Sequence, residues 1–121
     1  MILLDSNILI YSAQAPYAYL RPLVDNPDNC VSAFTMLEVL GFHALTPTDK
    51  AYFESAFVIL DVQDISFTLL QKAIQLRQMR KISPGDALIA ATALHLNCEL
   101  YTRNVSDFNW ITGLTVINPI L

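Results

Sequence analysis

The sequence predicts an α/β domain built on a mainly parallel sheet of five strands. Short apolar segments alternate along the chain with longer segments of helical periodicity, the pattern of a sheet covered by helices. The first segment, Ile2–Leu4, is apolar without interruption, as expected of a strand buried on both faces. The chain of 121 residues shows no linker, repeat or low-complexity stretch, so residues 1–121 are expected to form one domain.

The first half of the chain is expected to hold three strands with helices between them. Asp5 or Ser6 can cap the first helix, because short polar side chains accept hydrogen bonds from a helix start. The predicted segments after Ile2–Leu4 are a helix to about residue 14, a short helix over 17–24, a strand over 30–33, a helix over 35–44, a helix from the turn at 46–49 to about 56, and a β-branched strand over 58–62.

The second half begins with a helix predicted over residues 66–80. Phe67, Leu70, Ile74 and Arg77 recur there at helical spacing, which indicates an amphipathic helix. Strands are predicted over residues 99–102 and 114–117, and Asn118-Pro119 ends the last of them.

The helix expected over residues 84–96 has the clearest start signal. Ser83 is suited to the N-cap, Pro84 to the first helical position and Asp86 to the third. The helix is apolar on nearly every side, so it should be buried.

Composition and charge limit the classes of function that the chain can have. The net charge of −4 argues against a passive nucleic-acid binder, which is usually basic, but less against a nuclease whose carboxylates are offset by bound cations. No GxGxxG or GxxxxGK loop is present, which excludes the usual phosphate-binding loops of dinucleotide-binding and P-loop proteins. There is no secretory signal or membrane-length apolar run, so a cytoplasmic protein is expected, with Cys30 and Cys98 as buried thiols.

Four acidic residues are predicted at one edge of the sheet. Asp5, Glu38, Asp86 and Asp107 each fall shortly after a strand or in the first turns of the helix that follows it. Neighbouring carboxylates repel one another, and a divalent cation removes that repulsion. Oxygen ligands select Mg²⁺ or Mn²⁺, and such ions activate water for phosphodiester hydrolysis.

Each acid also has a structural explanation. Asp5 can end a strand, Asp107 can begin a turn, and the segments at residues 35–38 and 83–86 both match a capping box that stabilises a helix start. His43 and His95 are expected away from the acids, as surface or packed side chains.

Other polar residues fall near the same edge. Candidates to orient a carboxylate or a metal-bound water are Asn7, Asn104, Ser6 and Thr102. Arg103 is the nearest cation in sequence and a candidate phosphate contact. The basic cluster of Arg77, Arg80 and Lys81 is either a solvated helix end or a phosphate or partner contact.

Four segments, in order and spacing, resemble the motifs of PIN domains, in the branch of VapC-type toxins. They are MILLDSNILIY at residues 1–11, SAFTMLEVLG at 32–41, DALIAATA at 86–93 and YTRNVSDF at 101–108. Asn118-Pro119 is similar to the usual end of the family. The resemblance covers essentially the whole chain.

This resemblance implies a three-layer α/β/α fold and a metal-dependent endoribonuclease, the toxin of a type II toxin–antitoxin pair. It implies that Asp5, Glu38, Asp86 and Asp107 ligate one or two Mg²⁺ or Mn²⁺ ions, with Asn104 in support. Proteins of this kind usually form homodimers and are blocked by an antitoxin that covers the active site. The segment over residues 16–29 is short and contains prolines, so the helical arm there is expected to be trimmed.

Two rival interpretations differ in class. A receiver domain would use Asp61, at the end of the third predicted strand, as phosphate acceptor, but it would also need paired acids after the first strand and a late lysine. A catalytically silent PIN-like domain that serves as a binding or scaffold module would keep the fold without turnover.

Overall fold

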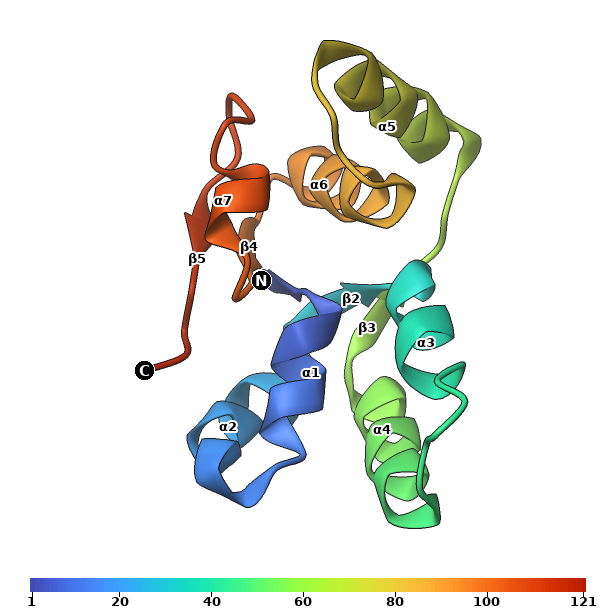
Figure 1. The fold of residues 1–121 in the computed structure, drawn as a ribbon, viewed down its shortest axis with the longest axis vertical. Coiled ribbons are helices and arrows are strands. Elements are labelled where there is room, and N and C mark those ends of the chain that lie inside the picture. Colours follow the sequence, from blue (N-terminus) through green and yellow to red (C-terminus); the bar gives the residue numbers. More distant parts are fainter.

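Five parallel strands form the sheet in the computed structural model, which describes residues 1–121 (Figure 1). The strands are β1 (Ile2–Leu4), β2 (Cys30–Ser32), β3 (Asp61–Gln63), β4 (Glu99–Tyr101) and β5 (Val116–Ile117). Their order across the sheet is β3-β2-β1-β4-β5, and every neighbouring pair is parallel. The predicted class is confirmed, and the carboxyl ends of all strands meet at one edge.

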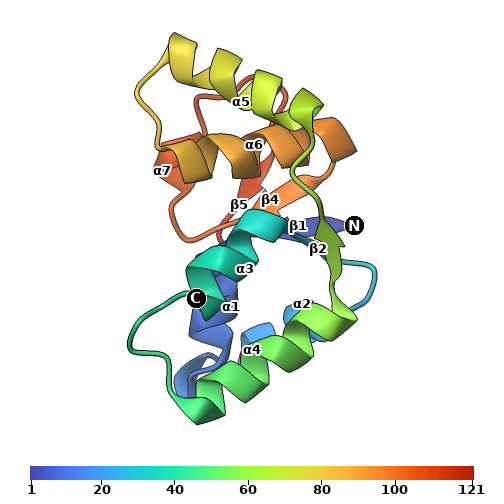
Figure 2. The same ribbon diagram turned by 90° about the vertical axis from the view of Figure 1, so that its right-hand side faces the viewer.

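Helices cover both faces of the sheet, which gives three layers (Figures 1 and 2). They are α1 (Ser6–Ser12), a 3₁₀ helix (Ala15–Leu20), α2 (Arg21–Val24), α3 (Ala33–Leu40), α4 (Pro47–Ile59), α5 (Phe67–Met79), α6 (Pro84–Leu96) and α7 (Val105–Phe108). α5 and α6 lie on one face, and α1, α3 and α4 on the other. None of these helices is long and apolar enough to cross a membrane.

Consecutive residues of β1 face opposite layers. Leu3 belongs to the apolar cluster under α5 and α6, whereas Leu4 packs in the cluster that holds Ile8 of α1 and Phe53 of α4. Both leucines are fully buried. This alternation explains why the strand is apolar at every position.

α6 confirms the predicted helix at residues 84–96. The Ser83 hydroxyl accepts a hydrogen bond of 3.1 Å from the backbone N–H of Asp86, and Pro84 opens the first turn. The helix ends at Asn97, which adopts the left-handed conformation with φ of 52°. Most of its middle residues are buried between α5 and the sheet, as its apolar character predicts.

The third strand was predicted too early in the sequence. Residues 58 and 59 continue α4, and the strand begins at Asp61. Phe53, Ala56 and Phe57 form the buried side of α4, while Val58 is 85% exposed, so helical packing overrides its β-branched preference. Asp61 therefore lies at the amino end of β3, opposite the edge where a receiver domain carries its acceptor, and this rival interpretation fails.

The helix predicted over residues 35–44 is α3, which begins and ends earlier. Ser32 is its N-cap, with the hydroxyl accepting a hydrogen bond of 3.1 Å from the N–H of Phe34. The capping box predicted at residues 35–38 is therefore wrong. Thr35 is fully buried inside the helix, and its hydroxyl has no hydrogen-bond partner.

α5 forms at the predicted residues but buries a different stripe. Its buried residues are Leu69, Ala73 and Leu76, which pack on α6. Phe67, Leu70 and Ile74, the spacing that predicted the helix, point to solvent, with Phe67 75% exposed. The helix therefore has two apolar stripes, and only one of them is covered.

Smaller differences lie in the connecting segments. The short helix expected over residues 17–24 is a 3₁₀ turn followed by the four residues of α2. The last strand is confined to Val116–Ile117 and follows a turn at residues 112–113, where Gly113 has φ of 85°. Cys30 is buried as predicted, whereas Cys98 is only half-buried, and both are free thiols.

Candidate functional site

Asp5 is the most enclosed acid at the carboxyl edge of the sheet. It follows β1 directly, is 5% exposed, and its backbone N–H donates to the carbonyl of Tyr101 on β4 at 3.0 Å. Its Oδ1 accepts from the N–H of Ser6 at 2.8 Å, which caps α1. Its Oδ2 accepts from the hydroxyl of Thr102 at 2.8 Å. The carboxylate is therefore held by the chain segments after β1 and β4.

Burial dominates the ionisation of Asp5. It raises the pKa of the carboxyl group, since a charge is less stable away from water. The hydrogen bonds from Thr102 and Ser6 act in the opposite direction, and the negative charge of Glu38 raises the pKa further. Glu38 on α3 therefore acts on Asp5 at the end of β1.

A polar network joins α1 to its neighbours. The hydroxyl of Ser6 donates to Oε1 of Glu38 at 2.6 Å. The amide of Asn7 donates to Thr102 and to Asp5, each at 3.3 Å, and its oxygen accepts from the N–H of Arg103 at 3.1 Å. Ser6, Asn7 and Thr102 therefore contact the predicted acids directly.

Asp86 lies half-buried in the first turn of α6. Burial, and then the negative charges of Asp5 and Asp107, raise its pKa from the usual 3.8 to about 6, with a smaller contribution from Glu38. All three remaining acids thus act on one carboxyl group. The four residues come from distant parts of the sequence and share one electrostatic environment.

Gly85 places Asp86 beside α3. A Cβ atom at Gly85 would lie only 2.6 Å from the ring of Phe34, so no other residue fits there without displacing the ring. Sequence reasoning did not identify Gly85 or Phe34 as part of the site. The signal was present, because a glycine near the start of a helix lowers helix propensity and indicates a packing requirement.

The segment after β4 carries the remaining predicted residues. Asp107 is exposed in the first turn of α7, and the backbone N–H of Asn104 donates to the hydroxyl of Thr102 at 3.1 Å. The guanidinium of Arg103 lies over the ring of Tyr11 on α1, 5.5 Å from its centroid. The two histidines are elsewhere: His43 lies in the turn after α3, and His95 at the far end of α6.

The four acids influence one another electrostatically, but they do not form a ready metal site. No three acidic, histidine or cysteine side chains are arranged so that they could hold a metal ion. The donor set nevertheless fits a hard cation, because every nearby group offers oxygen and the mutual repulsion on Asp86 is of the kind that a dication relieves.

The sequence matches the PIN domain family over residues 2–109. The chain belongs to the PIN domain family. Among solved structures, this PIN domain is similar to the toxin–antitoxin complex from Klebsiella pneumoniae, with 31% identity, a TM-score of 0.81, and coverage of 99% of this chain and 98% of that chain. The predicted resemblance to VapC-type PIN domains is therefore confirmed.

Two further structures share the fold of the PIN domain at lower identity. They are VapBC2 from Rickettsia felis bound to a promoter DNA fragment and FitAcB from Neisseria gonorrhoeae. Each is 24% identical, has a TM-score of 0.77, and is matched over 98% of both chains. A sequence search among curated proteins found no match.

Proposed function

We propose that this PIN domain is an endoribonuclease that depends on Mg²⁺ or Mn²⁺ and acts as the toxin of a toxin–antitoxin pair. One observation carries the proposal: hydrogen bonds from Ser6, Asn7 and Thr102 hold Asp5 and Glu38 at the carboxyl edge of the sheet, and the charges of these two acids, with that of Asp107, act on Asp86. The family match and the toxin–antitoxin neighbours support the same class.

Asp5, Glu38, Asp86 and Asp107 would hold one or two cations. When bound, such an ion supplies an activated water and stabilises the oxygen that leaves from a phosphodiester. Ser6 orients Glu38, and Thr102 with Asn7 orients Asp5. Asn104 and Arg103 lie on the same loop as Thr102, where Asn104 would support the site and Arg103 would meet a phosphate after leaving Tyr11.

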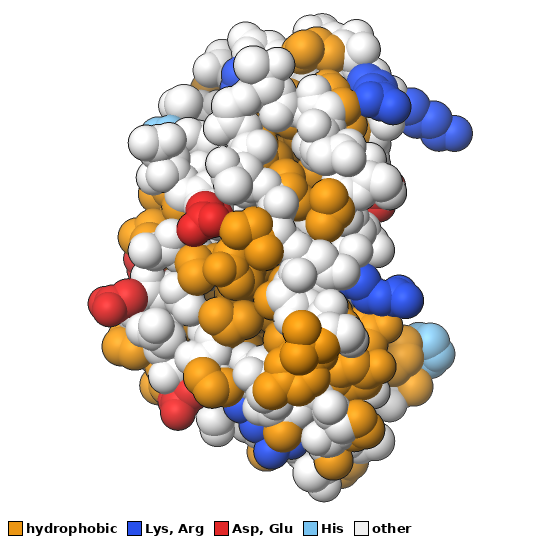
Figure 3. All heavy atoms as spheres, turned by 90° about the vertical axis from the view of Figure 1, so that its left-hand side faces the viewer, with side chains coloured by type: hydrophobic (Ala, Val, Ile, Leu, Met, Phe, Trp, Pro, Cys, Tyr) orange, Lys and Arg blue, Asp and Glu red, His pale blue; other side chains and the backbone are white.

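An antitoxin would bind beside Glu38. A groove of about 230 Å³ lies there between α1, α3 and α4, lined by Ile10, Val39, Phe42 and Phe53 among others. Leu37 on the same helix as Glu38 is 68% exposed. Figure 3 shows further hydrophobic side chains gathered on the half of the molecule that holds α1 and α2. A partner that fills the groove would also cover Glu38, which lines it.

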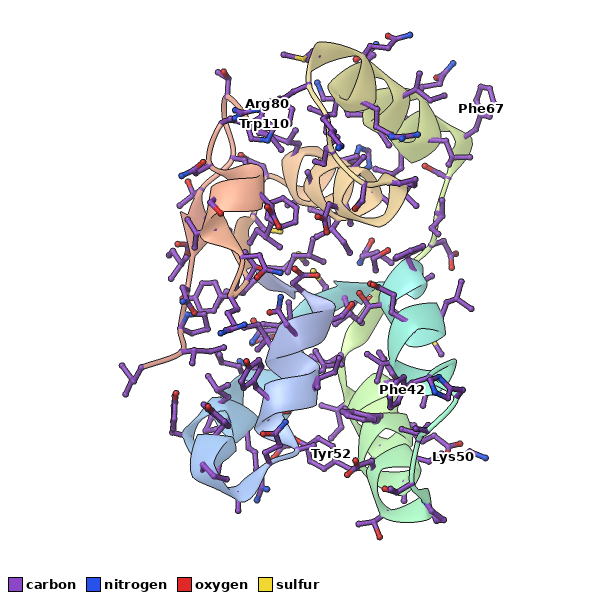
Figure 4. All side chains as sticks on the ribbon, viewed as in Figure 1. Phe42, Lys50, Tyr52, Phe67, Arg80 and Trp110 are labelled. Atoms are coloured by element: carbon purple, nitrogen blue, oxygen red, sulfur yellow. The ribbon has the colours of Figure 1, made fainter.

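The uncovered stripe of α5 is a candidate surface for a homodimer. Phe67, Leu70 and Ile74 are exposed on one side of this helix, and Figure 4 shows Phe67 directed away from the body of the molecule. A second copy of the chain would bury them.

Since the proposed substrate is RNA, we place the protein in the cytoplasm.

A silent PIN-like scaffold is the second candidate, because no three acids are yet arranged to hold a metal. Incubation of the pure protein with single-stranded RNA and Mn²⁺ separates the two. We expect cleavage that EDTA and Asp86→Asn abolish, and that Asp61→Asn preserves, since Asp61 is an exposed acid at the opposite edge. Intact RNA in the presence of Mn²⁺ would favour the scaffold.

A further inference from the structure

A cavity of about 310 Å³ opens beside two of the acids. Asp86 and Asp107 line it, together with Arg80, Lys81, Ser106 and Trp110. Its volume is at the lower end of the roughly 300–1,000 Å³ typical of small-ligand sites. The cavity therefore has room for one small group directly next to two of the proposed metal ligands.

The charges around this cavity are divided. Arg80 and Lys81 line it together with Asp86 and Asp107, although the chain has only 7 basic residues against 11 acidic ones. Both basic side chains are exposed and belong to the loop between α5 and α6. Two basic side chains beside the proposed metal ligands favour the binding of an anion that extends from the basic side chains to the acids' edge.

Trp110 supplies an aromatic surface in the same cavity. Its indole N–H donates to the carbonyl of Asp107 at 2.9 Å, which ties the ring to α7. The guanidinium of Arg80 lies over the ring, 5.5 Å from its centroid, and Figure 4 shows the two side chains next to each other. A planar cation on an aromatic ring is a platform on which a nucleobase can stack.

We propose that this cavity, the Arg80–Trp110 pocket, binds one nucleotide of single-stranded RNA adjacent to the phosphodiester cleaved at the acids. Arg80 and Lys81 contact the phosphate of that nucleotide, and the Arg80–Trp110 pair stacks on its base. The inference rests on the proposed function, since it needs RNA at the neighbouring acids. The inference assigns a role to Arg80 and Lys81, the part of the basic cluster after α5 that the proposed cleavage chemistry does not use.

The single tryptophan of the chain reports on the pocket directly. We expect a mixed-sequence single-stranded RNA, added with Ca²⁺ in place of Mg²⁺, to quench the fluorescence of Trp110. Lys81→Gln and Arg80→Gln should each weaken binding and lower the slope of log affinity against log salt by about 0.7, the value for one lost phosphate contact on a single strand. Lys50→Gln, the same change of charge near the start of α4 and outside the pocket, is the matched control (Figure 4).

The aromatic part is tested by labelled RNA and anisotropy. Trp110→Ala should weaken binding roughly 10-fold, as expected for one lost stacking contact. Trp110→Phe loses the indole hydrogen bond but keeps a ring, so it should restore most of the affinity. If Trp110→Ala does not fold, the two exposed basic variants still test the pocket.

Three outcomes would overturn the inference. One is RNA cleavage by the wild-type chain with no quenching of Trp110. Another is a loss for Lys50→Gln as large as that for Lys81→Gln, and the third is stronger quenching by poly-L-glutamate than by RNA, which indicates an acidic peptide instead. Failure of the proposed function is distinguishable, because the wild-type chain would then cleave no RNA with Mn²⁺.

Discussion

The hydroxyl of Ser6 donates a hydrogen bond of 2.6 Å to the carboxylate of Glu38 and so joins the first turn of α1 to α3. Glu38 is otherwise an exposed side chain on a surface helix. A flexible glutamate loses rotamer freedom when it is fixed, and a short bond to a charged acceptor is strong enough to fix it. Ser6 thereby directs Glu38 toward the edge that holds Asp5.

Ser6→Ala should therefore weaken metal binding more than it weakens the fold. Loss of a residue that orients a ligand typically lowers metal affinity by about 10- to 100-fold. The free energy of unfolding should fall by only about 0.5–1.5 kcal/mol, because one hydrogen bond is lost. Calorimetric titration with Mn²⁺ and a urea melt measure the two effects. Equal affinity in the variant and the wild type would show that Ser6 has no orienting role.

Asp86→Asn should stabilise the metal-free protein, and more so as pH rises. The pKa of Asp86 is raised from 3.8 to about 6 in the folded chain, so between these values the folded state binds the proton more tightly. Its ionisation therefore lowers the free energy of unfolding as pH rises through this range, whereas asparagine does not ionise and causes no such loss. Thermal melts in EDTA at pH 4 and pH 7 test this. A melting difference between variant and wild type that shrinks toward pH 7 would contradict it.

Gly85→Ala should destabilise the chain by about 1–3 kcal/mol, the usual result of overpacking. The added Cβ meets Phe34 at 2.6 Å, so either the ring or the start of α6 must move. Because Asp86 follows directly, cleavage should fall as well. The double variant with Phe34→Leu makes room and should recover part of the stability. A single variant that melts with the wild type would show that α6 and α3 are not tightly packed.

Thr35→Val should leave the free energy of unfolding unchanged or raise it by about 1 kcal/mol. The buried Thr35 hydroxyl has no hydrogen-bond partner, and valine has nearly the same shape without the polar group. Chemical denaturation measures the change. A clear loss of stability would mean that the hydroxyl has a partner, such as a buried water, that is lost with it.

The sequence predicted the fold class and the start of α6 better than it predicted which helix faces are buried. The fold class follows from alternating segments, and α6 follows from Ser83, Pro84 and its uniform apolarity, because both signals are local. The buried side of α5 could not be predicted, since Phe67 and Leu69 head two competing apolar stripes and only the position of α6 selects between them. Val58 is similar: its β preference yielded to the packing of Phe53 and Phe57.

In the site, too, residue positions could be predicted from the sequence but contacts between distant residues could not. The positions of Asp5 and Asp86 follow from the ends of strands and the starts of helices, which parallel sheets bring to one edge. The bond between Ser6 and Glu38 could not be read from the sequence, because it joins residues 32 positions apart across two helices. The contact of Arg80 with Trp110 likewise depends on how two loops meet.

Direct titration of the metal-free protein with Mn²⁺ tests the central claim most closely. The negative charges around Asp86 raise its pKa, and the proposed dication would relieve this repulsion. The wild-type chain and Asp61→Asn should therefore bind Mn²⁺ with equal affinity, and Asp86→Asn should bind it far more weakly. A wild-type chain that takes up no Mn²⁺, or an Asp86→Asn variant that binds it as well as the wild type, would contradict the account.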